Sequence, residues 1–218
     1  MSEIIVQTHT FLTLLGGGST HFSHVKQALK IAPILVAADG GADTALAAGH
    51  MPDAVIGDMD SISDAARAQI DENHLHYIAE QDSTDFDKCL RSIDAPAILA
   101  VGFSGGRLDH QLAACTSLVK FPDKRVVMLS EEDLCFLSPL ELALDLPTGT
   151  RISLYPMAEL RGAGTGLRYP IDGLTMSPST FVGTSNEVAG PVRLRFESRA
   201  MLVILPRDCL DVVLAAIT

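Results

Sequence analysis

The sequence has no surplus of basic residues and no long hydrophobic run. Its 218 residues include 16 Lys and Arg against 27 Asp and Glu, which gives a net charge of -11. A surface of this charge does not neutralise nucleic-acid phosphates, so a nucleic-acid-binding protein is not expected. No apolar run approaches the ~20 residues that span a bilayer, so no transmembrane helix is expected either. An anionic ligand would have to be bridged to such a protein by metal ions.

The chain also lacks paired cysteines. Cys89, Cys115, Cys135 and Cys209 are far apart and form no CxxC pair. This spacing is typical of buried thiols in a reducing compartment rather than of a disulfide framework. The N-terminal residues include the acidic Glu3 and no basic segment, so they do not match a secretory signal. We therefore expect a soluble, cytoplasmic protein.

The first half of the sequence alternates short apolar runs with segments of helical periodicity. The runs are FLTLL (11–15), ILVAA (34–38), AVIG (54–57), LHYIA (75–79), AILAVG (97–102) and RVVML (125–129). Alternation of this kind predicts right-handed crossovers and a mostly parallel sheet with helices on both faces. Ligands of such sheets bind beyond the carboxyl ends of the strands.

Two of the helical segments between these runs have apolar faces at helical spacing. In a sheet covered on both sides, we expect such faces to pack against the strands. The residues that share a face are Phe86, Leu90 and Ile93 in one segment, and Leu108, Leu112, Cys115 and Val119 in the other.

The pattern changes after about residue 138. The later apolar segments are short and β-rich, are separated by Gly and Pro, and show no long helical period: RISLYPM (151–157), LRYPI (167–171), STFVGT (179–184), VRLRFES (192–198) and AMLVILP (200–206). VRLRFES alternates polar and apolar residues, as a half-buried antiparallel strand does. We predict an α/β domain over residues 1–138, with a mostly parallel sheet and helices on both faces. A smaller antiparallel β-sandwich domain is predicted over residues 139–218.

A polar loop follows each of the first five apolar runs. The loops are GGGST (16–20), DGGAD (39–43), GDMDSIS (57–63), EQDSTDFDK (80–88) and FSGGRLDHQ (103–111). Because the carboxyl ends of parallel strands meet at one edge of a sheet, we expect all five loops at that edge. Glycine appears in four of them and carboxylates appear in four.

Each of these loops also has a simpler interpretation. GGGST lacks the GxGxxG and GxxxxGK[ST] spacings of phosphate-binding loops and is compatible with a flexible turn. Asp39, Ser83, Thr84 and Asp109 are residue types that cap helices or occupy first turns. Together, however, six carboxylates at one edge would repel one another unless a cation joined them. Carboxylate oxygens suit Mg²⁺, which also binds substrate phosphates. The six are Asp39, Asp58, Asp60, Asp82, Asp85 and Asp109.

Asp58 and Asp60 follow a predicted strand and flank Met59. If the backbone stays extended across them, both carboxylates point to one side and Met59 points to the other. That spacing fits joint binding of a metal ion and a phosphate. A solvated turn remains an alternative, because Ser61 and Ser63 can start a helix here. A nucleophile with its acid is a further alternative.

Few basic residues lie in these loops. Arg107 follows two glycines that let the backbone approach a ligand, and its planar guanidinium suits bidentate phosphate binding. Lys88 lies on the helix opened by Ser83, Thr84 and Asp85 and can face either the loops or the other side. His110, beside Asp109, can hydrogen-bond a phosphate or cap the helix.

The sequence resembles the thiamine pyrophosphokinase family. The motifs that carry the resemblance, in order, are ADGGAD (38–43), GDMDSIS (57–63), DSTDFDKCL (82–90) and GFSGGRLDHQLA (102–113). GLRYPI (166–171) and GTSNE (183–187) are similar to two later elements of that family, so the resemblance covers nearly the whole chain. It implies a catalytic α/β domain and a thiamine-binding β-sandwich domain. It also implies a homodimer whose active site lies at the subunit interface.

The resemblance further implies transfer of the pyrophosphoryl group of ATP to the hydroxyl of thiamine, giving thiamine diphosphate and AMP. It places Asp58, Asp60 and Asp85 at Mg²⁺ and the phosphate chain, with Arg107 and Asp109 completing the catalytic set. The nucleotide and phosphate contacts expected from the family and from the loops are Gly17, Asp39, Gly40, Asp82, Thr84, Lys88, Gly106 and His110. The expected thiamine contacts are Ser185, Asn186 and Leu202.

The chain departs from the family pattern at the thiamine end. It contains no Trp, and Leu202 lies near the place where eukaryotic members have a Trp that stacks on thiamine. Tyr169 stands where the GLKW-type element has Trp. Gly183 replaces the first Ser of the S-T-S-N element. The nucleotide-binding motifs have no such departures.

Two other functions are considered. DMDSI nearly matches the DxDx[TV] motif of haloacid-dehalogenase-type phosphatases, but its fifth residue is Ile62 and it follows the third apolar run rather than the first. A non-enzymatic nucleotide-binding regulator, with the second half as a regulatory module, is the other alternative. Formation of AMP, rather than of free phosphate or no product, distinguishes the three.

Overall fold

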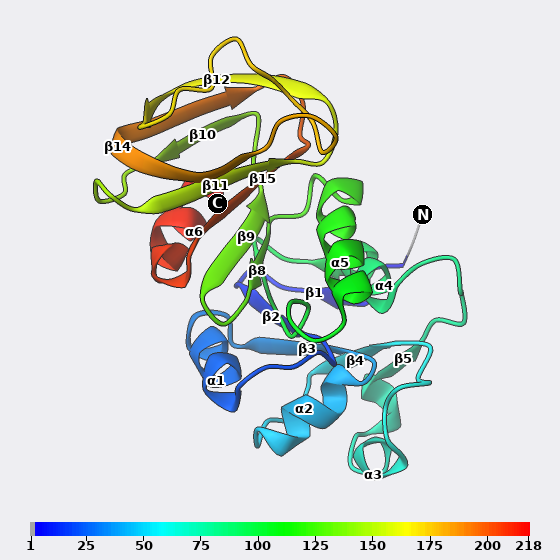
Figure 1. The fold of residues 1–218 in the computed structure, drawn as a ribbon. Helices are drawn as coiled ribbons and strands as arrows, with labels where there is room; N and C mark the ends of the chain where they lie inside the picture. The colour runs from blue at the N-terminus through cyan, green and yellow to red at the C-terminus, as the bar shows by residue number, and fades with distance from the viewer. Residues whose placement is uncertain (1–2) are drawn as a thin grey trace. The chain divides into compact units, whose positions relative to one another are not determined.

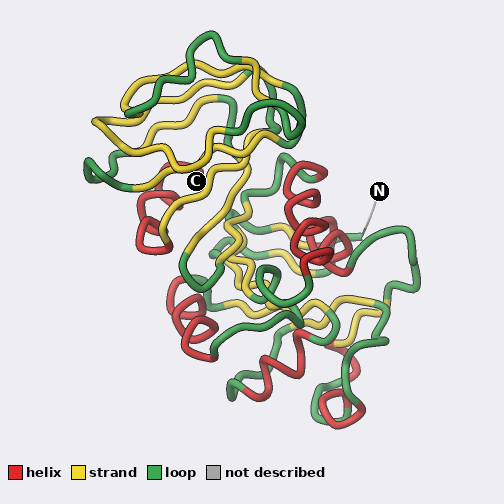
Figure 2. Tube along the Cα trace, in the orientation of Figure 1, coloured by secondary structure: helices red, strands yellow, loops and turns green. Residues whose placement is uncertain are grey.

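Residues 3–218 are described in the computed structural model (Figures 1 and 2). They form two compact units. The first extends to Ser117 and includes Met128–Glu131, and the second comprises Leu118–Val127 and Glu132–Thr218. The domain boundary near residue 138 stays a prediction. No helix among the described residues combines the length and the apolar character that crossing a membrane requires.

Parallel strands form the centre of the first unit. β2 pairs with β3 and β7, β3 with β4, and β4 with β5, all in parallel, and β8 lies beside β7. The six strands predicted in this half are confirmed. Their bounds are β2 (Leu12–Leu15), β3 (Ile34–Ala38), β4 (Ala54–Gly57), β5 (Leu75–Tyr77), β7 (Ile98–Val101) and β8 (Val126–Leu129). A separate parallel pair, β1 (Val6–Gln7) and β6 (Ile93–Asp94), was not predicted.

The helices of this half lie on both sides of these strands. The steps from β2 to β3 and from β3 to β4 run one way across the sheet, so right-handed crossovers put α1 and α2 on one face. The return from β5 to β7 puts α4 on the other face, as Figure 1 shows. The helices are α1 (Phe22–Ile31), α2 (Gly41–Ala47), α3 (Asp64–Arg67), η1 (Glu72–His74), α4 (Asp85–Ser92) and α5 (Leu108–Lys120).

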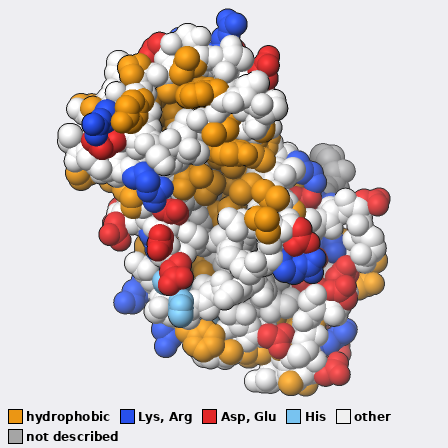
Figure 3. Space-filling model, in the orientation of Figure 1, with side chains coloured by type: hydrophobic (Ala, Val, Ile, Leu, Met, Phe, Trp, Pro, Cys, Tyr) orange, Lys and Arg blue, Asp and Glu red, His pale blue; other side chains and the backbone are white. Residues whose placement is uncertain are grey.

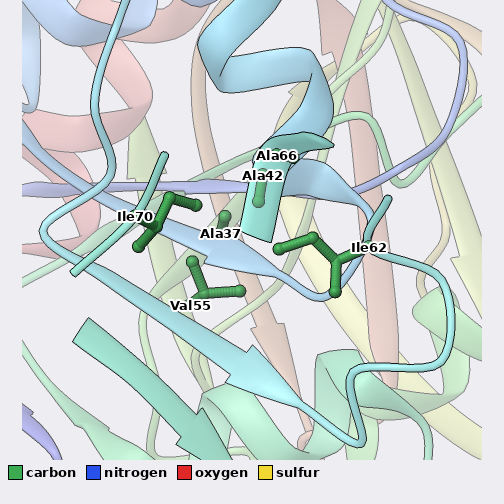
Figure 4. Close-up of a cluster of buried hydrophobic side chains, with 6 residues drawn as sticks. All are labelled: Ala37, Ala42, Val55, Ile62, Ala66 and Ile70. Carbon is green, nitrogen blue, oxygen red and sulfur yellow. The ribbon is translucent and has the colours of Figure 1, made fainter. Parts of the chain in front are cut away.

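Both faces of the parallel strands are buried, which explains why they appear in the sequence as continuous apolar runs. Every residue of β2, β4, β7 and β8 is buried. A core cluster joins β3, α2, β4, α3 and the residues on either side of α3 (Figure 4): Ala37, Ala42, Val55, Ile62, Ala66 and Ile70. Full burial of an Ile or Val side chain contributes about 1.5–3 kcal/mol to folding, so this cluster anchors the segment after β4.

The prediction that the apolar face of α5 packs against the strands is wrong for Leu108 and Leu112. Leu108 and Leu112 are 68% and 60% exposed, and Figure 3 shows hydrophobic side chains gathered over α5. The buried residues of the helix are instead Ala114, Ser117 and Leu118. Small residues let the helix approach its neighbours closely, and Ser117 donates a 2.5 Å hydrogen bond to the buried Asp87 of α4. Apolar periodicity identified a face of the helix but not its environment.

Antiparallel pairing dominates the second unit. β14 pairs with β10, β11 and β12, β12 with β13, and β15 with β11 and β9. The bounds are β9 (Asp133–Leu137), β10 (Glu141–Leu144), β11 (Arg151–Pro156), β12 (Leu160–Leu167), β13 (Thr175–Met176), β14 (Gly183–Phe196), β15 (Met201–Pro206), η2 (Arg207–Cys209) and α6 (Leu210–Ile217). Alternate residues from Val192 to Phe196 are buried, as the VRLRFES pattern predicts.

Three expectations for the second half are wrong. LRYPI is not a strand, because β12 ends at Leu167 after Gly166 adopts a φ of +81°. STFVGT contributes only its last residues, since β14 begins at Gly183. A helix, α6, ends the chain although no helix was expected after residue 138. Its eight residues form an almost wholly apolar segment that is too short to show clear periodicity.

Candidate functional site

The five polar loops lie at one edge of the parallel strands, as predicted. The pairing of β2, β3, β4, β5 and β7 is parallel throughout, so the carboxyl ends of these strands are adjacent. Specific contacts then join each loop to the next. The site is therefore assembled from segments far apart in the sequence.

Glycine lets the first loop pack against its two neighbours. The Gly18 amide donates to the Gly102 carbonyl at 3.0 Å, and a Cβ atom added to Gly18 would lie 2.4 Å from that oxygen. A Cβ atom on Gly16 would lie 2.7 Å from the same oxygen, whereas one on Gly17 would make an ordinary contact, 3.4 Å from the Gly40 carbonyl carbon. Close backbone packing thus accounts for Gly16 and Gly18. The phosphate contacts expected of Gly17 and Gly40 stay predictions.

Asp39 connects the second loop to the third. Its side chain is 1% exposed and accepts hydrogen bonds from three consecutive backbone amides, those of Asp60 at 3.2 Å, Ser61 at 3.2 Å and Ile62 at 2.8 Å. Asp39 does not cap α2. The N-cap position is Gly40, and no side chain forms a cap hydrogen bond there. The carboxylate holds the loop that carries Asp58 and Asp60.

The backbone does not stay extended between Asp58 and Asp60. Met59 has a φ of +58°, in the left-handed region, so the expected extended geometry is wrong. The turn packs Met59 against the core cluster that includes Ile62. Ser63 then caps α3 by accepting a 3.1 Å hydrogen bond from the Ala66 amide, as its residue type predicted.

Three carboxylates from two loops meet at this turn. Oxygen atoms of Asp39, Asp58 and Asp60 all lie within 4.8 Å of one another. Asp58 Oδ1 is buried and accepts no hydrogen bond from any residue of the described chain. A buried carboxylate oxygen without a donor is a candidate metal ligand, and several hard oxygens match the preference of Mg²⁺. The residues therefore fit a magnesium ion.

Lys88 brings Asp85 to the same place. Its side chain is 2% exposed, and Nζ lies 2.9 Å from Asp85 Oδ1 and 3.3 Å from Asp58 Oδ2. Of the two directions considered for Lys88, the one toward the loops is thus observed. Burial lowers the pKa of Lys88, but the bonds to Asp85 and Asp58 outweigh it and raise the pKa overall. The ammonium stays charged and holds the two carboxylates together. The metal role of Asp85 stays a prediction.

Sequence reasoning missed Gln81. Its Nε2 donates to Asp58 Oδ2 at 2.8 Å, which joins the fourth loop to the third. The residue carries no charge and therefore drew no attention among six carboxylates. Its place in the EQDSTDFDK loop, directly before Asp82, was the available signal.

The carboxylates of the cluster differ in proton affinity. Burial, a hydrogen bond shared with Asp58 and the negative charge of Asp85 raise the pKa of Asp39 to about 6. Burial also raises the pKa of Asp58, but hydrogen bonds from Gln81 and Lys88 outweigh it and lower that pKa. Of Asp39 and Asp58, Asp58 is therefore the one that stays ionised to lower pH.

The fifth loop presents an exposed ion pair. Arg107 Nη2 lies 2.6 Å from Asp109 Oδ2, and Nε donates to Oδ1 at 3.1 Å, with both side chains mostly exposed. The hydrogen bond from Arg107 lowers the pKa of Asp109 to about 2. Gly106, just before the pair, has a φ of +75° that favours glycine. Asp82, Thr84 and His110 are also exposed, and Thr84 caps α4.

The predicted thiamine contacts lie in the second unit. Asn186 is 5% exposed and holds the backbone of Tyr169, whose amide donates to Oδ1 at 3.1 Å and whose carbonyl accepts from Nδ2 at 2.8 Å. Ser185 has a φ of +59°, and its amide donates to Ser153 Oγ. Leu202 is 2% exposed within β15. The thiamine contacts of these residues stay predictions.

Comparison with known proteins identifies the family. The family model for "Thiamin pyrophosphokinase, catalytic domain" matches residues 25–129, which contain all four main motifs. The thiamine pyrophosphokinase of Bacillus subtilis (strain 168) is 31% identical over 165 residues, or 70% of this chain and 77% of that protein. The chain belongs to the thiamine pyrophosphokinase family.

A plant member of the thiamine pyrophosphokinase family, thiamine pyrophosphokinase 1 of Oryza sativa subsp. japonica, is 32% identical over 166 residues. The match covers 64% of this chain and 60% of that protein. Thiamine pyrophosphokinase 1 of Arabidopsis thaliana is 30% identical over 166 residues, with 64% and 59% covered. The chain thus spans about 60% of the length of these plant relatives.

Solved structures of the family share the fold. Yeast thiamin pyrophosphokinase matches with a TM-score of 0.76 at 17% identity, over 98% of this chain and 94% of that one. The Bacillus subtilis enzyme matches with a TM-score of 0.70 at 23% identity, over 90% and 98%. Both matches extend well beyond residues 25–129, so the mixed α/β fold of the family is present.

Proposed function

We propose that this protein is a thiamine pyrophosphokinase. It transfers the β,γ-pyrophosphoryl group of ATP to the hydroxyl of thiamine, giving thiamine diphosphate and AMP. The observation that carries this proposal is the group of Asp39, Asp58 and Asp60, whose oxygens lie within 4.8 Å of one another at the edge formed by the family motifs. Neither a phosphatase nor a nucleotide-binding regulator is supported by both the carboxylate group and the family motifs.

The proposed chemistry relies on positioning and charge neutralisation. Phosphoryl-type transfer needs an in-line arrangement and compensation of the negative charge on the transferred and leaving groups. Asp58, Asp60 and Asp85 would hold Mg²⁺, which supplies positive charge to the phosphates when bound. Lys88 orients two of these carboxylates through its buried ammonium. A strongly acidic site also attracts thiamine, which is a cation.

Arg107 is proposed to bind the transferred phosphates. Its guanidinium now pairs with Asp109 through two bonds on the surface, and exposed ion pairs of this kind exchange partners at little cost. A phosphate offers the same bidentate geometry with more charge. Asp109 would then orient the guanidinium from one side.

The remaining assignments follow the same reasoning. Exposed loop residues are proposed to face the nucleotide: Gly17, Asp82, Thr84, Gly106 and His110. Gly40 and Lys88 are proposed to contact the phosphates beside them. Ser185, Asn186 and Leu202 are proposed for the thiamine end, with the second half forming a β-sandwich domain after residue 138. We further propose a cytoplasmic homodimer whose active site lies at the subunit interface.

The test is the product analysis of a single reaction. Purified protein with Mg²⁺, ATP and thiamine should form AMP and thiamine diphosphate in equal amounts. Formation of ADP, or turnover that survives EDTA, would contradict the mechanism. Release of free phosphate would favour a phosphatase, and nucleotide binding without any product would favour a regulator.

A further inference from the structure

We propose that Asp39 and Asp43 are positioning residues that set the conformation of the turn carrying Asp58 and Asp60. For its effect on catalysis this inference rests on the proposed function, but the geometry itself does not. The two residues begin and end the DGGAD segment: Asp39 directly follows β3, and Asp43 lies in the first turn of α2. The phosphate contact expected of Asp39 stays a prediction, and the role proposed for both residues here is to position the turn.

The hydrogen bonds between the two loops run in one direction. Five of them go from residues 60–63 to the two carboxylates. Asp39 accepts from the amides of Asp60, Ser61 and Ile62, whereas Asp43 accepts from the Ser63 amide at 3.0 Å and from the Ser63 hydroxyl. Four consecutive backbone amides, those of residues 60–63, are thus bound by the carboxylates of Asp39 and Asp43.

The turn needs such partners because it has no regular structure of its own. Met59 is in the left-handed region, which residues other than glycine rarely adopt. Ile62 is buried in the core cluster, so its amide is not free to bond water, and an unpaired buried amide is strongly unfavourable. The Asp39 carboxylate satisfies this amide with the shortest of its three bonds, at 2.8 Å.

Asp39 is itself held rigidly enough to act as a template. Its amide donates to the Ile56 carbonyl of β4 at 3.1 Å, and its own φ is +43°. A Cβ atom added to Gly57 would lie 2.8 Å from the Asp39 Cβ, so the two backbones are in close contact there. Figure 4 shows Ile62 and Ala42 of the same two segments packed in one apolar cluster.

This arrangement separates the role of Asp39 from those of Asp58 and Asp60. Asp39 is 1% exposed, and both of its carboxylate oxygens already accept backbone hydrogen bonds. Asp58, by contrast, retains a buried Oδ1 without a donor among the described residues. Asp39 therefore acts through the turn: it determines where Asp58 and Asp60 point.

The test uses Asp39→Asn and Asp43→Asn, with Asp53→Asn as the matched control. Asp53 also accepts a backbone hydrogen bond across neighbouring strands, from the Leu35 amide at 2.8 Å, but it precedes β4 and lies at the opposite end from the turn. Hydrogen exchange of the peptide 58–63 reports on the turn. Binding of Mn²⁺ alone, measured by electron paramagnetic resonance, reports on the carboxylates without any substrate.

In Asp39→Asn the amide nitrogen faces the Asp60 N–H instead of an acceptor oxygen, so one or more of the three bonds is lost. Exchange of the amides of residues 60–62 should become on the order of tenfold faster. Mn²⁺ should bind several-fold more weakly but still bind. Asp43→Asn should produce a smaller change of the same kind, and it keeps the test decisive if Asp39→Asn does not fold. Asp53→Asn should change neither readout.

Two outcomes would overturn the inference. Unchanged exchange of peptide 58–63 in both variants would show that the carboxylates do not hold the turn. Complete loss of Mn²⁺ binding with normal exchange in Asp39→Asn would instead make Asp39 a direct ligand. Because neither measurement contains thiamine or ATP, failure of the proposed function would appear separately, as wild-type protein that forms no AMP.

Discussion

A buried lysine surrounded by carboxylates is the most consequential single residue of the site. Lys88 is 1% exposed and bonds to Asp58 and Asp85 from different loops. A buried cation is tolerated only when paired, and removing one partner leaves the others uncompensated. Lys88 thus has both a structural role and a role in holding the metal ligands.

Replacing this lysine tests its structural role. Lys88→Met keeps most of the side-chain volume but removes the charge, so Asp58 and Asp85 lose their counter-ion. We expect the free energy of unfolding in urea to fall by about 3–5 kcal/mol without divalent metal. Added Mg²⁺ should restore part of it, since the ion supplies positive charge to the same carboxylates.

Lys30→Met, on the exposed surface of α1, is the matched control and should lie within about 0.5 kcal/mol of wild type. An unchanged unfolding free energy for Lys88→Met would contradict the structural role of the buried ammonium.

Asp58 and Asp60 can be tested for their role in catalysis. Asp58→Asn and Asp60→Asn should each lower the rate of AMP formation at least about 100-fold, because each removes charge at the proposed metal. Circular dichroism should show that the fold is retained. Asp53→Asn should keep near-normal activity. Full activity of both variants would contradict the metal site and favour the alternative that Asp58 and Asp60 form a solvated turn before α3.

Individual elements are held together by bonds between a loop and the helix that follows it. Glu80 accepts hydrogen bonds from Ser83 at 2.6 Å and from Arg91 at 2.9 Å, which ties the loop after β5 to the last turn of α4. The hydrogen bonds from Arg91 and Ser83 lower the pKa of Glu80 to about 2.

This lowered pKa predicts how the contact depends on pH. The unfolded chain binds the Glu80 proton near its ordinary value of about 4.5, whereas the folded chain binds it near 2. The contribution of Glu80 is therefore complete above about pH 4.5 and is lost as the pH falls toward 2. The difference in unfolding free energy between wild type and Glu80→Gln should be largest at pH 7 and shrink by pH 3. A difference independent of pH would contradict this assignment.

Strand prediction succeeded where both faces of a strand are covered, as in β2 and β4, because continuous burial requires a continuous apolar run. Helix prediction was less complete. Leu108 and Leu112 of the apolar face of α5 are exposed, and α6 was missed. Periodicity records which side chains lie on the same side of a helix. It does not record what covers them.

At the scale of the whole molecule, the exposed face of α5 is relevant to assembly. Leu108 and Leu112 are 68% and 60% exposed, and Leu108 lies between Arg107 and Asp109 in the sequence. Adjacent exposed leucines next to site residues are compatible with an interface to a second copy of the chain. This supports the proposed homodimer with its site at the subunit interface.

Sedimentation tests this assignment. The wild-type protein should sediment at twice the mass of the 23.2 kDa chain. Leu112→Asp places a charge on the apolar face, so it should shift the protein to monomer and lower AMP formation. Met51→Asp, at a 53% exposed residue in the loop after α2, should remain dimeric. Monomeric wild-type protein would contradict the proposed homodimer.

The sequence by itself determined the alternation of strands and helices, the placement of five polar loops at one edge, and helix starts at Ser61 or Ser63 and at Ser83 or Thr84. Local periodicity, the handedness of crossovers and the chemistry of helix starts control these features. Only the tertiary structure decided which polar groups meet. Asp39 and Asp60 are 21 residues apart, and Gln81 and Asp58 are 23 apart, so no local pattern relates them. Parallel pairing brings these residues together at the carboxyl ends of the strands. There the buried Asp39 carboxylate and the buried Ile62 amide must find partners.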